Sequence, residues 1–529
     1  MTSPDALPGG SVVPAARMET AQEPQADRLA ASVPPLPWRD RLRVAIAWGL
    51  LWAVIGALAL NYLAPKPWSI QPIRATELRA SLAVLDHGGP ALLGYRPGTH
   101  VAYAIGYSDD QGIYVIVPVL SHWLGASDPV AVLRWLWVAA WALALLFSAV
   151  VFGSLFRSSW AALLAPPTLL VCIFSFGFGD IYWVAAWVVV ALMPLLILLA
   201  RRRPRGMWAA IAAIAFVAGC VTAVRSDAGL GVGLAAVVVA AMAGGRWRRR
   251  AAVIAAVGAA YLAPTWIVMP LIRDHRDHYV GTNLSAQAPT SHPLWHSLYI
   301  GLGYTSNRYG IHYRDGYAAA AAQEADPGVA YLSPAYSRAL HKQVDALIEH
   351  DPSFVVRAEA QKGVVELSHA GRYVLLLALL LPAAIAARGP ARLRPRELAL
   401  FIPAVLIGAL PAIVAIPIRD YELGLLAPLA ALGLLAIGSV AASAEGVWTA
   451  TRGADSGLAG HARLMLQGLW DAWPKRATYR ALAPAVVILA LAFVFARHVE
   501  AEHESWDRSE RNPPKVVLAA VSAGLPPVA

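Results

Sequence analysis

Two adjacent carboxylates, Asp109 and Asp110, stand directly before an apolar run that ends at Leu124. Holding two acids at the edge of an apolar segment costs desolvation, so the pair is suited to act as a general base, a cation ligand or an acceptor for a donor hydroxyl. A structural role competes with this one. Ser108 and Gln111 have the spacing of a capping box, and the helix macrodipole favours acids in a first turn. Local sequence leaves both interpretations open.

A second polar stretch, residues 299–317, interleaves tyrosines with glycines and charged groups. Such a stretch suits a lid that stacks on a sugar and hydrogen-bonds its hydroxyls. The alternative is a packed loop that its own tyrosines stabilise. The candidate substrate contacts are Tyr114 after the acid pair and, in this stretch, Tyr304, Arg308, Tyr309 and Arg314.

Two histidine pairs in the same region raise the question of a metal. His275 and His278 are three residues apart and His292 and His296 four apart, which can place each pair on one helical face. The pattern is not His-Glu-x-x-His, and Pro293 directly follows His292. The histidines are therefore interpreted as solvated or hydrogen-bonding groups. A divalent metal is left open but not indicated, and we predict no metal ligands and no cofactor.

The composition requires a membrane. Of the 529 residues, 58% are hydrophobic and only 14% charged, which is too much apolar surface for a water-soluble globule. The net charge of +10 comes from arginines in short runs between apolar stretches, as in the cytoplasmic loops of membrane proteins. This distribution argues against nucleic-acid binding. Cys172 and Cys220 lie inside apolar stretches, which excludes a disulfide framework on the outer face.

The chain contains about eleven stretches with the roughly 20 apolar residues that a helix needs to cross a bilayer. They cover residues 43–63, 130–156, 159–178, 181–200, 207–224, 228–245, 251–272, 373–388, 398–417, 423–443 and 481–497. Because backbone groups in lipid must be paired within the segment, we predict an all-α fold, a polytopic transmembrane helical bundle.

A cytoplasmic N-terminus places every arginine run on the cytoplasmic side. The predicted organisation begins with a disordered cytoplasmic tail at 1–37 and an N-terminal transmembrane module at 38–272, which includes an outer first loop at 64–129. A mostly helical outer loop domain follows at 273–372. A C-terminal transmembrane module at 373–497 and a C-terminal tail at 498–529 complete the prediction.

Three helices are predicted in the outer segments. Residues 75–86 form an amphipathic helix that lies along the membrane surface. Residues 333–350 and 351–368 each begin with a capping residue followed by proline, which suits the first position of a helix.

The first loop resembles that of a known superfamily. It has an acid pair a few residues before Tyr114, then an apolar helix that ends at Asp128-Pro129, then a long span. This order is similar to that of the C-type (GT-C) membrane glycosyltransferases. These include protein O-mannosyltransferases and the aminoarabinose transferase that modifies lipid A. The layout is similar over the first ten spans, with the main outer domain between the seventh and eighth. The match between residues is confined to the first-loop motif.

The resemblance implies transfer of a sugar from a polyprenyl phosphate to an acceptor hydroxyl, with inversion at the anomeric carbon. It implies that Asp109 or Asp110 is the catalytic base, without saying which, and that Asp180 in a second outer loop is a companion acid. An N-cap for the fourth span is the alternative role of Asp180. Arg225 and Arg419, at outer helix ends, would stabilise the leaving phosphate or else simply snorkel to the interface.

We therefore expect an integral, multi-pass membrane glycosyltransferase of a bacterial inner (plasma) membrane. Its expected partners are a polyprenyl-phosphate-linked sugar, membrane lipids and an acceptor lipid, glycan or protein on the non-cytoplasmic face. Two alternatives are an oligosaccharide polymerase or ligase, which would use loop arginines and histidines, and a lipid or glycan transporter. Transporters place polar groups near the bilayer midplane, whereas the middles of these spans are nearly free of charge.

Overall fold

The computed structural model describes residues 37–62, 70–96, 98, 101–105, 110–176, 180–203, 206–242, 246–287, 292–451, 460, 462–463, 466–467 and 473–509. Within them the chain is an all-α polytopic bundle, as predicted. The tail predicted at 1–37 lies outside the described residues apart from Pro37, as does Asp109.

Within the described residues, nine helices are long and apolar enough to cross a membrane. They are α2 (Trp38–Tyr62), α5 (Pro129–Phe156), α6 (Ser159–Phe176), α7 (Trp183–Arg202), α8 (Met207–Val224), the continuous run of α10 (Trp247–Ala263), η1 (Pro264–Val268) and α11 (Met269–Val280), α16 (Pro352–Ala386), α19 (Arg419–Thr451) and α21 (Lys475–Ser509). In that run, η1 is one π-helical turn that begins at Pro264. The chain is therefore an integral multi-pass membrane protein.

Two of the eleven predicted spans are shorter than expected. The sixth is α9 (Leu230–Ala241), an apolar helix of 12 residues. The ninth is α18 (Ile402–Val414), which is bent by 50° from the short segment that carries η2 (Gly389–Ala391) and α17 (Pro395–Ala399). The prediction of about eleven spans thus has the right positions, but nine or ten helices of the described residues meet the length of a full crossing.

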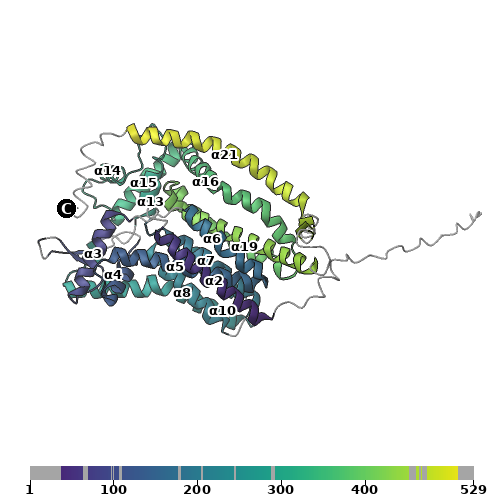
Figure 1. Ribbon diagram of the computed structural model, residues 1–529. Coiled ribbons are helices and arrows are strands. Elements are labelled where there is room, and N and C mark those ends of the chain that lie inside the picture. Colours follow the sequence, from purple (N-terminus) through teal and green to yellow (C-terminus); the bar gives the residue numbers. More distant parts are fainter. Residues whose placement is uncertain are drawn as a thin grey trace, which may run out of the picture.

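The interior of the bundle is formed by α5, α6, α7 and α19, and α7 and α19 are the most enclosed helices. Trp137, Trp141, Phe152 and Phe156 of α5 are completely or almost completely buried there. The helices α16 and α21 pack along each other and form one edge of the molecule (Figure 1). This arrangement leaves the outer ends of α6, α8, α18 and α19 free to support the smaller elements described next.

Those smaller elements gather at one end of the bundle (Figure 1). From the first loop come α3 (Pro72–Asp86), β1 (Leu93–Tyr95), β2 (Ala102–Ala104) and α4 (Ile113–Leu124). From the outer loop domain come α12 (Leu284–Gln287), α13 (Leu294–Gly301), α14 (Asp315–Ala325) and α15 (Pro334–His350). The strands pair antiparallel, with Leu93 opposite Ala104. An apolar cluster that includes Val84, Leu93 and Leu284 joins the two outer segments.

The predicted capping residues do start their helices. The side chain of Ser333 accepts a hydrogen bond from the backbone N–H of Tyr336 at 3.1 Å, and that of Asp351 accepts one from Phe354 at 3.1 Å. The helix that begins after Asp351 does not end near residue 368. It continues as α16 to Ala386, so the outer domain and the eighth span share one helix of 35 residues.

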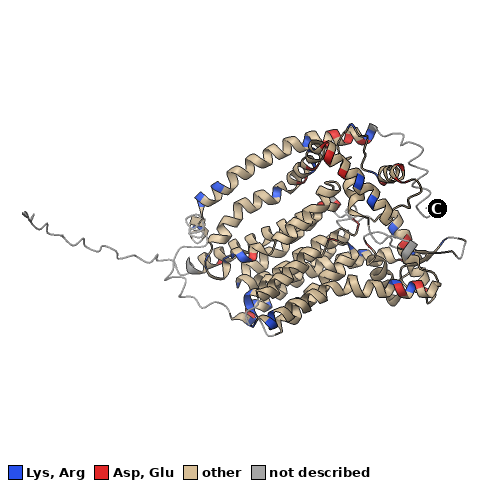
Figure 2. Ribbon diagram, turned by 180° about the vertical axis from the view of Figure 1, so that it is seen from behind, with Lys and Arg blue, Asp and Glu red and all other residues tan. Residues whose placement is uncertain are grey.

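The charged side chains separate between the two ends of the bundle. Most acids lie at the end that carries α3 and α13 to α15, while clusters of Lys and Arg mark the opposite end (Figure 2). At that opposite end Arg201 binds Glu397 at 2.6 Å and the backbone oxygen of Arg392 at 2.7 Å. The arginine-rich stretches at 201–203 and 388–396 thus meet in space, and the two predicted outer segments share the other end.

Close packing of α18 on α19 yields a test of the bundle. A Cβ added at Gly408 would lie 2.0 Å from the backbone oxygen of Gly424, whereas one added at Gly258 of α10 meets nothing within 4 Å. Small residues let membrane helices approach closely. We expect Gly408→Ala to destabilise the protein by about 1–3 kcal/mol through overpacking. Gly258→Ala should leave thermal unfolding in detergent unchanged or slightly improved, and equal behaviour of the two variants would contradict the packing.

Candidate functional site

An arginine lies between two buried aspartates at the end of the bundle that carries the predicted outer segments. Arg74 projects from the first turn of α3, Asp110 precedes α4, and Asp180 lies between α6 and α7. The Nε of Arg74 is 2.7 Å from Oδ2 of Asp180, and its Nη1 pairs with Oδ2 of Asp110. The three residues are only 7%, 1% and 6% exposed. Buried charges of this kind are stable only when they are paired.

Local backbone features bring the two acids to this point. The N–H of Gly112 donates to the carbonyl oxygen of Ala223 at the end of α8, at 2.8 Å, and any Cβ at Gly112 would lie 2.7 Å from the Ala223 carbonyl carbon. Only glycine permits this approach. Asp180 has a positive φ of 30°, a conformation that non-glycine residues rarely adopt. Its Oδ2 accepts from the backbone N–H of Gln71 at 3.3 Å.

Two further charged residues complete the group. Arg225 follows α8, and its guanidinium carbon lies 4.8 Å from the centre of the Tyr182 ring and 5.6 Å from that of Tyr421. Asp420, in the first turn of α19, is close enough to interact electrostatically with Asp180 and with both arginines. We refer to Arg74, Asp110, Asp180, Arg225 and Asp420 as the acid centre. It holds three carboxylates against two guanidinium groups.

The electrostatics make Asp180 a stronger base than an ordinary aspartate. Burial raises the pKa of Asp180, and the nearby Asp420 carboxyl acts in the same direction. Arg74 and the Gln71 amide oppose the rise without cancelling it. Its second oxygen, Oδ1, is buried and has no hydrogen-bond partner among the described residues. Native proteins rarely leave a buried carboxylate oxygen unused, so this atom is the one best placed to receive a proton from a ligand.

The structure brings together only part of the predicted site. Asp110, Asp180 and Arg225 belong to the acid centre, and Asp180 is not a side-chain cap, because α7 begins at an N-cap Tyr182 without such a bond. Asp109 lies outside the described residues, as does the side chain of Arg419, although that residue begins α19. The helix α4 begins at an N-cap Gly112 without a side-chain cap, and Ser108 of the predicted capping box lies outside the described residues.

Tyr114 lies next to the acid centre but points into the packing between α3 and α4. Its side chain is 2% exposed and hydrogen-bonds Glu77. Burial raises its pKa, so the hydroxyl stays protonated and bonds Glu77. The ring helps to fix α3, and therefore Arg74, against the segment that carries Asp110.

The tyrosine-rich stretch 299–317 is largely packed within the protein. Tyr304 is 3% exposed and its ring stacks on that of His503 from α21 at 4.3 Å. A Cβ at Gly301 would meet the backbone oxygen of Val414 at 2.3 Å, and one at Gly303 the backbone of His312 at 2.6 Å. These glycines are therefore required for close packing.

One tyrosine of this stretch reaches the acid centre. Tyr313 hydrogen-bonds Tyr421 and lies close enough to Tyr182 to interact with it electrostatically. The rings of Tyr182 and Tyr421 meet edge to face at 5.7 Å. The outer domain thus contacts the aromatic residues that hold Arg225.

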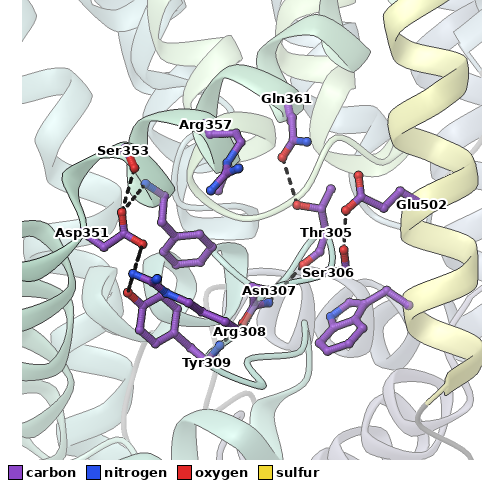
Figure 3. A pocket seen from close by; sticks show the side chains of 13 residues that line it. Thr305, Ser306, Asn307, Arg308, Tyr309, Asp351, Ser353, Arg357, Gln361 and Glu502 are labelled. Carbon is purple, nitrogen blue, oxygen red and sulfur yellow. Dashed lines mark hydrogen bonds and ion pairs between the residues drawn. The ribbon is translucent and has the colours of Figure 1, made fainter.

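Two other predicted contacts line a cavity of about 670 Å³ near the outer surface (Figure 3). Arg308 binds Oδ2 of Asp351 at 2.7 Å, and the hydroxyl of Tyr309 donates to the same oxygen at 3.0 Å. Its wall also includes Arg357, Gln361, Glu502 and Trp506. Charged groups and one indole make this wall suitable for a hydroxyl-rich or anionic group. Arg314 instead forms an exposed ion pair with Asp507 of α21 at 3.0 Å.

Several residues that matter here carry little signal in the sequence. Arg74 looks like an ordinary charge in an amphipathic helix, and only the structure places it between two acids. The outer turns of α21 were assigned to a tail, yet Trp506 lines the cavity. A partly buried group also joins three helices: His369 of α16 lies 2.5 Å from Glu422 of α19 and 2.9 Å from Glu500 of α21.

Comparison with known proteins provides no assignment, because no family model, no curated protein and no solved structure matches the chain. The functional argument therefore depends on the geometry.

Among the described residues, one group has the composition and spacing to hold a metal ion: His292, His296 and Asp315.

The buried pairing of Arg74 generates a stability prediction. Arg74→Gln leaves two buried carboxylates without their shared cation, and such a loss costs about 3–5 kcal/mol. The matched control is Arg79→Gln on the same helix, where Arg79 makes an exposed 3.5 Å pair with Asp128. Exposed pairs are worth about 0–1 kcal/mol. Thermal unfolding in detergent measures both variants, and a small effect of Arg74→Gln would argue against the buried pair.

Proposed function

We propose that the chain is an integral membrane glycosyltransferase that moves a sugar from a polyprenyl-phosphate donor to an acceptor hydroxyl on the non-cytoplasmic face. The observation that carries the proposal is the acid centre: buried carboxylates, one with an unbonded oxygen and a raised pKa, held by arginines where an apolar bundle ends. A lipid-linked donor would present its phosphate at this depth, because its isoprenoid chain stays in the hydrocarbon.

The proposed reaction uses the acids and arginines in separate roles. The acceptor hydroxyl gives its proton to a carboxylate of the acid centre while its oxygen forms a bond to the anomeric carbon. The bond from that carbon to the phosphate oxygen breaks on the opposite face, which inverts the configuration. Polyprenyl phosphate leaves with the bonding electrons, and Arg225 stabilises its charge. Arg74 is a positioning residue that keeps Asp110 and Asp180 in place.

The family resemblance implies Asp109 or Asp110 as the base, whereas the geometry supports Asp180. Arg74 pairs with Oδ2 of both Asp110 and Asp180, and Oδ1 of Asp180 has no hydrogen-bond partner among the described residues. Asp180 is therefore the best base among the described residues, and Asp109 is the other candidate. A transporter is less well supported. Among the described residues, the buried charged groups lie near helix ends or, like Lys362 and Glu366 of α16, before the predicted span at 373–388. Buried serines such as Ser148 and Ser439 occupy the inner parts of their spans.

Substitution of the acids tests the proposal. We expect Asp180→Asn to lower kcat for transfer from a lipid-linked sugar by about 10²–10⁴-fold, the usual contribution of a general base. Asp109→Asn and Asp110→Asn show which first-loop acid contributes. The control is Asp86→Asn, an exposed acid at the end of α3 that pairs with His122, and it should stay within about twofold.

The pH profile of transfer adds a second readout. Because burial raises the pKa of Asp180, the acidic limb should lie above the normal range for aspartate and should disappear in Asp180→Asn. Full activity in all three acid variants would refute the acid centre as the reaction site. If Arg308 variants were inactive at the same time, an oligosaccharide polymerase or ligase would be favoured instead.

We further propose that the cavity at Arg308 and Tyr309 binds part of the acceptor. Arg308→Ala removes a charged donor from its wall, so KM for the acceptor should rise about tenfold with kcat nearly unchanged. Arg338→Ala on α15 is the control, because that arginine is exposed and does not line the cavity. Unchanged KM in Arg308→Ala would exclude the cavity from acceptor binding.

A further inference from the structure

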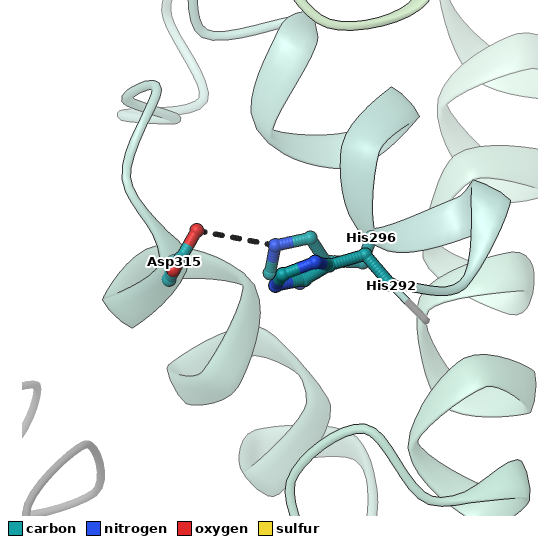
Figure 4. A group of neighbouring side chains, drawn as sticks. All are labelled: His292, His296 and Asp315. Carbon is teal, nitrogen blue, oxygen red and sulfur yellow. Dashed lines mark hydrogen bonds and ion pairs between the residues drawn. The ribbon is translucent and has the colours of Figure 1, made fainter. Parts of the chain in front are cut away.

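Three side chains with metal-binding atoms converge in the outer loop domain (Figure 4). His292 precedes α13, His296 lies in its first turn, and Asp315 is the first residue of α14. One ligand atom from each lies within 4.8 Å of the others, and Nε2 of His296 is 3.2 Å from Oδ1 of Asp315. Two ligands of one tetrahedral ion bound at about 2.1 Å are separated by roughly this distance.

The buried histidine has the support that a metal ligand requires. Nδ1 of His296 is 2.7 Å from the hydroxyl of Tyr336, and both residues are 1% exposed. A bond at one ring nitrogen fixes the ring and directs the other nitrogen toward the ion. Here that other nitrogen, Nε2, faces Asp315.

The remaining two residues supply charge and access. The Asp315 carboxylate bonds His296 and Tyr331 and supplies a negative charge beside the two imidazoles. The side chain of Asp315 is 60% exposed and His292 is partly exposed, which leaves an entry route and room for water as a further ligand.

We propose that His292, His296 and Asp315 bind one divalent transition-metal ion, with zinc as the best match. Two imidazoles and a carboxylate suit zinc and its neighbours in the first row, whereas Mg²⁺ and Ca²⁺ prefer oxygen ligands throughout. The ion joins the start of α13 to the start of α14. The segment between these two points lines the cavity and carries Tyr313. The ion therefore fixes both ends of this segment.

The alternative is a hydrogen-bonded chain from Tyr336 through His296 to Asp315 without any ion. This chain needs His296 and Asp315 but not His292, which lies 5.0 Å from His296 between ring centres. The contribution of His292 therefore distinguishes the two arrangements.

The test is zinc binding by the full chain, purified in detergent without a nickel column and stripped with EDTA. Titration with ZnCl₂ followed by calorimetry should give one site per chain, with no comparable uptake of Mg²⁺. His292→Ala and Asp315→Asn should weaken binding at least tenfold, and Tyr336→Phe about 10–100-fold through loss of the supporting bond. His278→Ala on α11 is the matched control and should bind as the unmodified chain does.

Each variant is also followed by thermal unfolding with EDTA and with zinc. Zinc should raise the apparent Tm of the unmodified chain and of His278→Ala, but not that of His292→Ala. Absence of zinc uptake by the unmodified chain, or equal uptake by His292→Ala in a folded state, would overturn the proposal. Because these readouts require no sugar transfer, they stand or fall independently of the proposed enzymatic activity.

Discussion

Arg74 cannot be buried unless two acids meet it, and much of the outer end of the bundle follows from that requirement. The guanidinium draws together α3, the approach to α4 and the turn between α6 and α7, three segments that are distant in sequence. Removing charges from water is costly, so these segments must be held in place by contacts that involve no charge. The Gly112 approach to α8 and the packed ring of Tyr114 provide such contacts. The same burial makes Asp180 a stronger base.

A single short segment connects the features of the outer domain. Residues 305–309 line the cavity, Tyr313 contacts Tyr421 beside the acid centre, and Asp315 faces His296. These residues follow one another closely in the chain. In the proposed enzyme, acceptor binding in the cavity and proton transfer at the acid centre would be coupled through this segment.

The sequence was sufficient for features that depend on composition along the chain. Apolar runs of about 20 residues located the spans, and capping residues located the starts of α15 and α16. Because the helical turns between residues 352 and 372 are polar, the sequence did not show that the helix beginning at Pro352 continues into the eighth span. The sequence carries no comparable signal for residues that are distant along the chain but close in the fold. Arg74 and Asp180 are 106 positions apart in the printed sequence, and no periodicity joins a histidine before α13 to an aspartate at the start of α14.

The contacts of α21 with residues 304–311 can form only late in synthesis of the chain. The indole of Trp506 donates to the backbone oxygen of Ile311, 195 residues earlier in the chain, and His503 bonds the backbone oxygen of Tyr304 across 199 residues. At about 5–20 residues per second, ribosomes need roughly 10–40 seconds to make that interval. During this time residues 304–311 are without their contacts to α21. The helix α21 therefore completes a surface whose other half was synthesised long before.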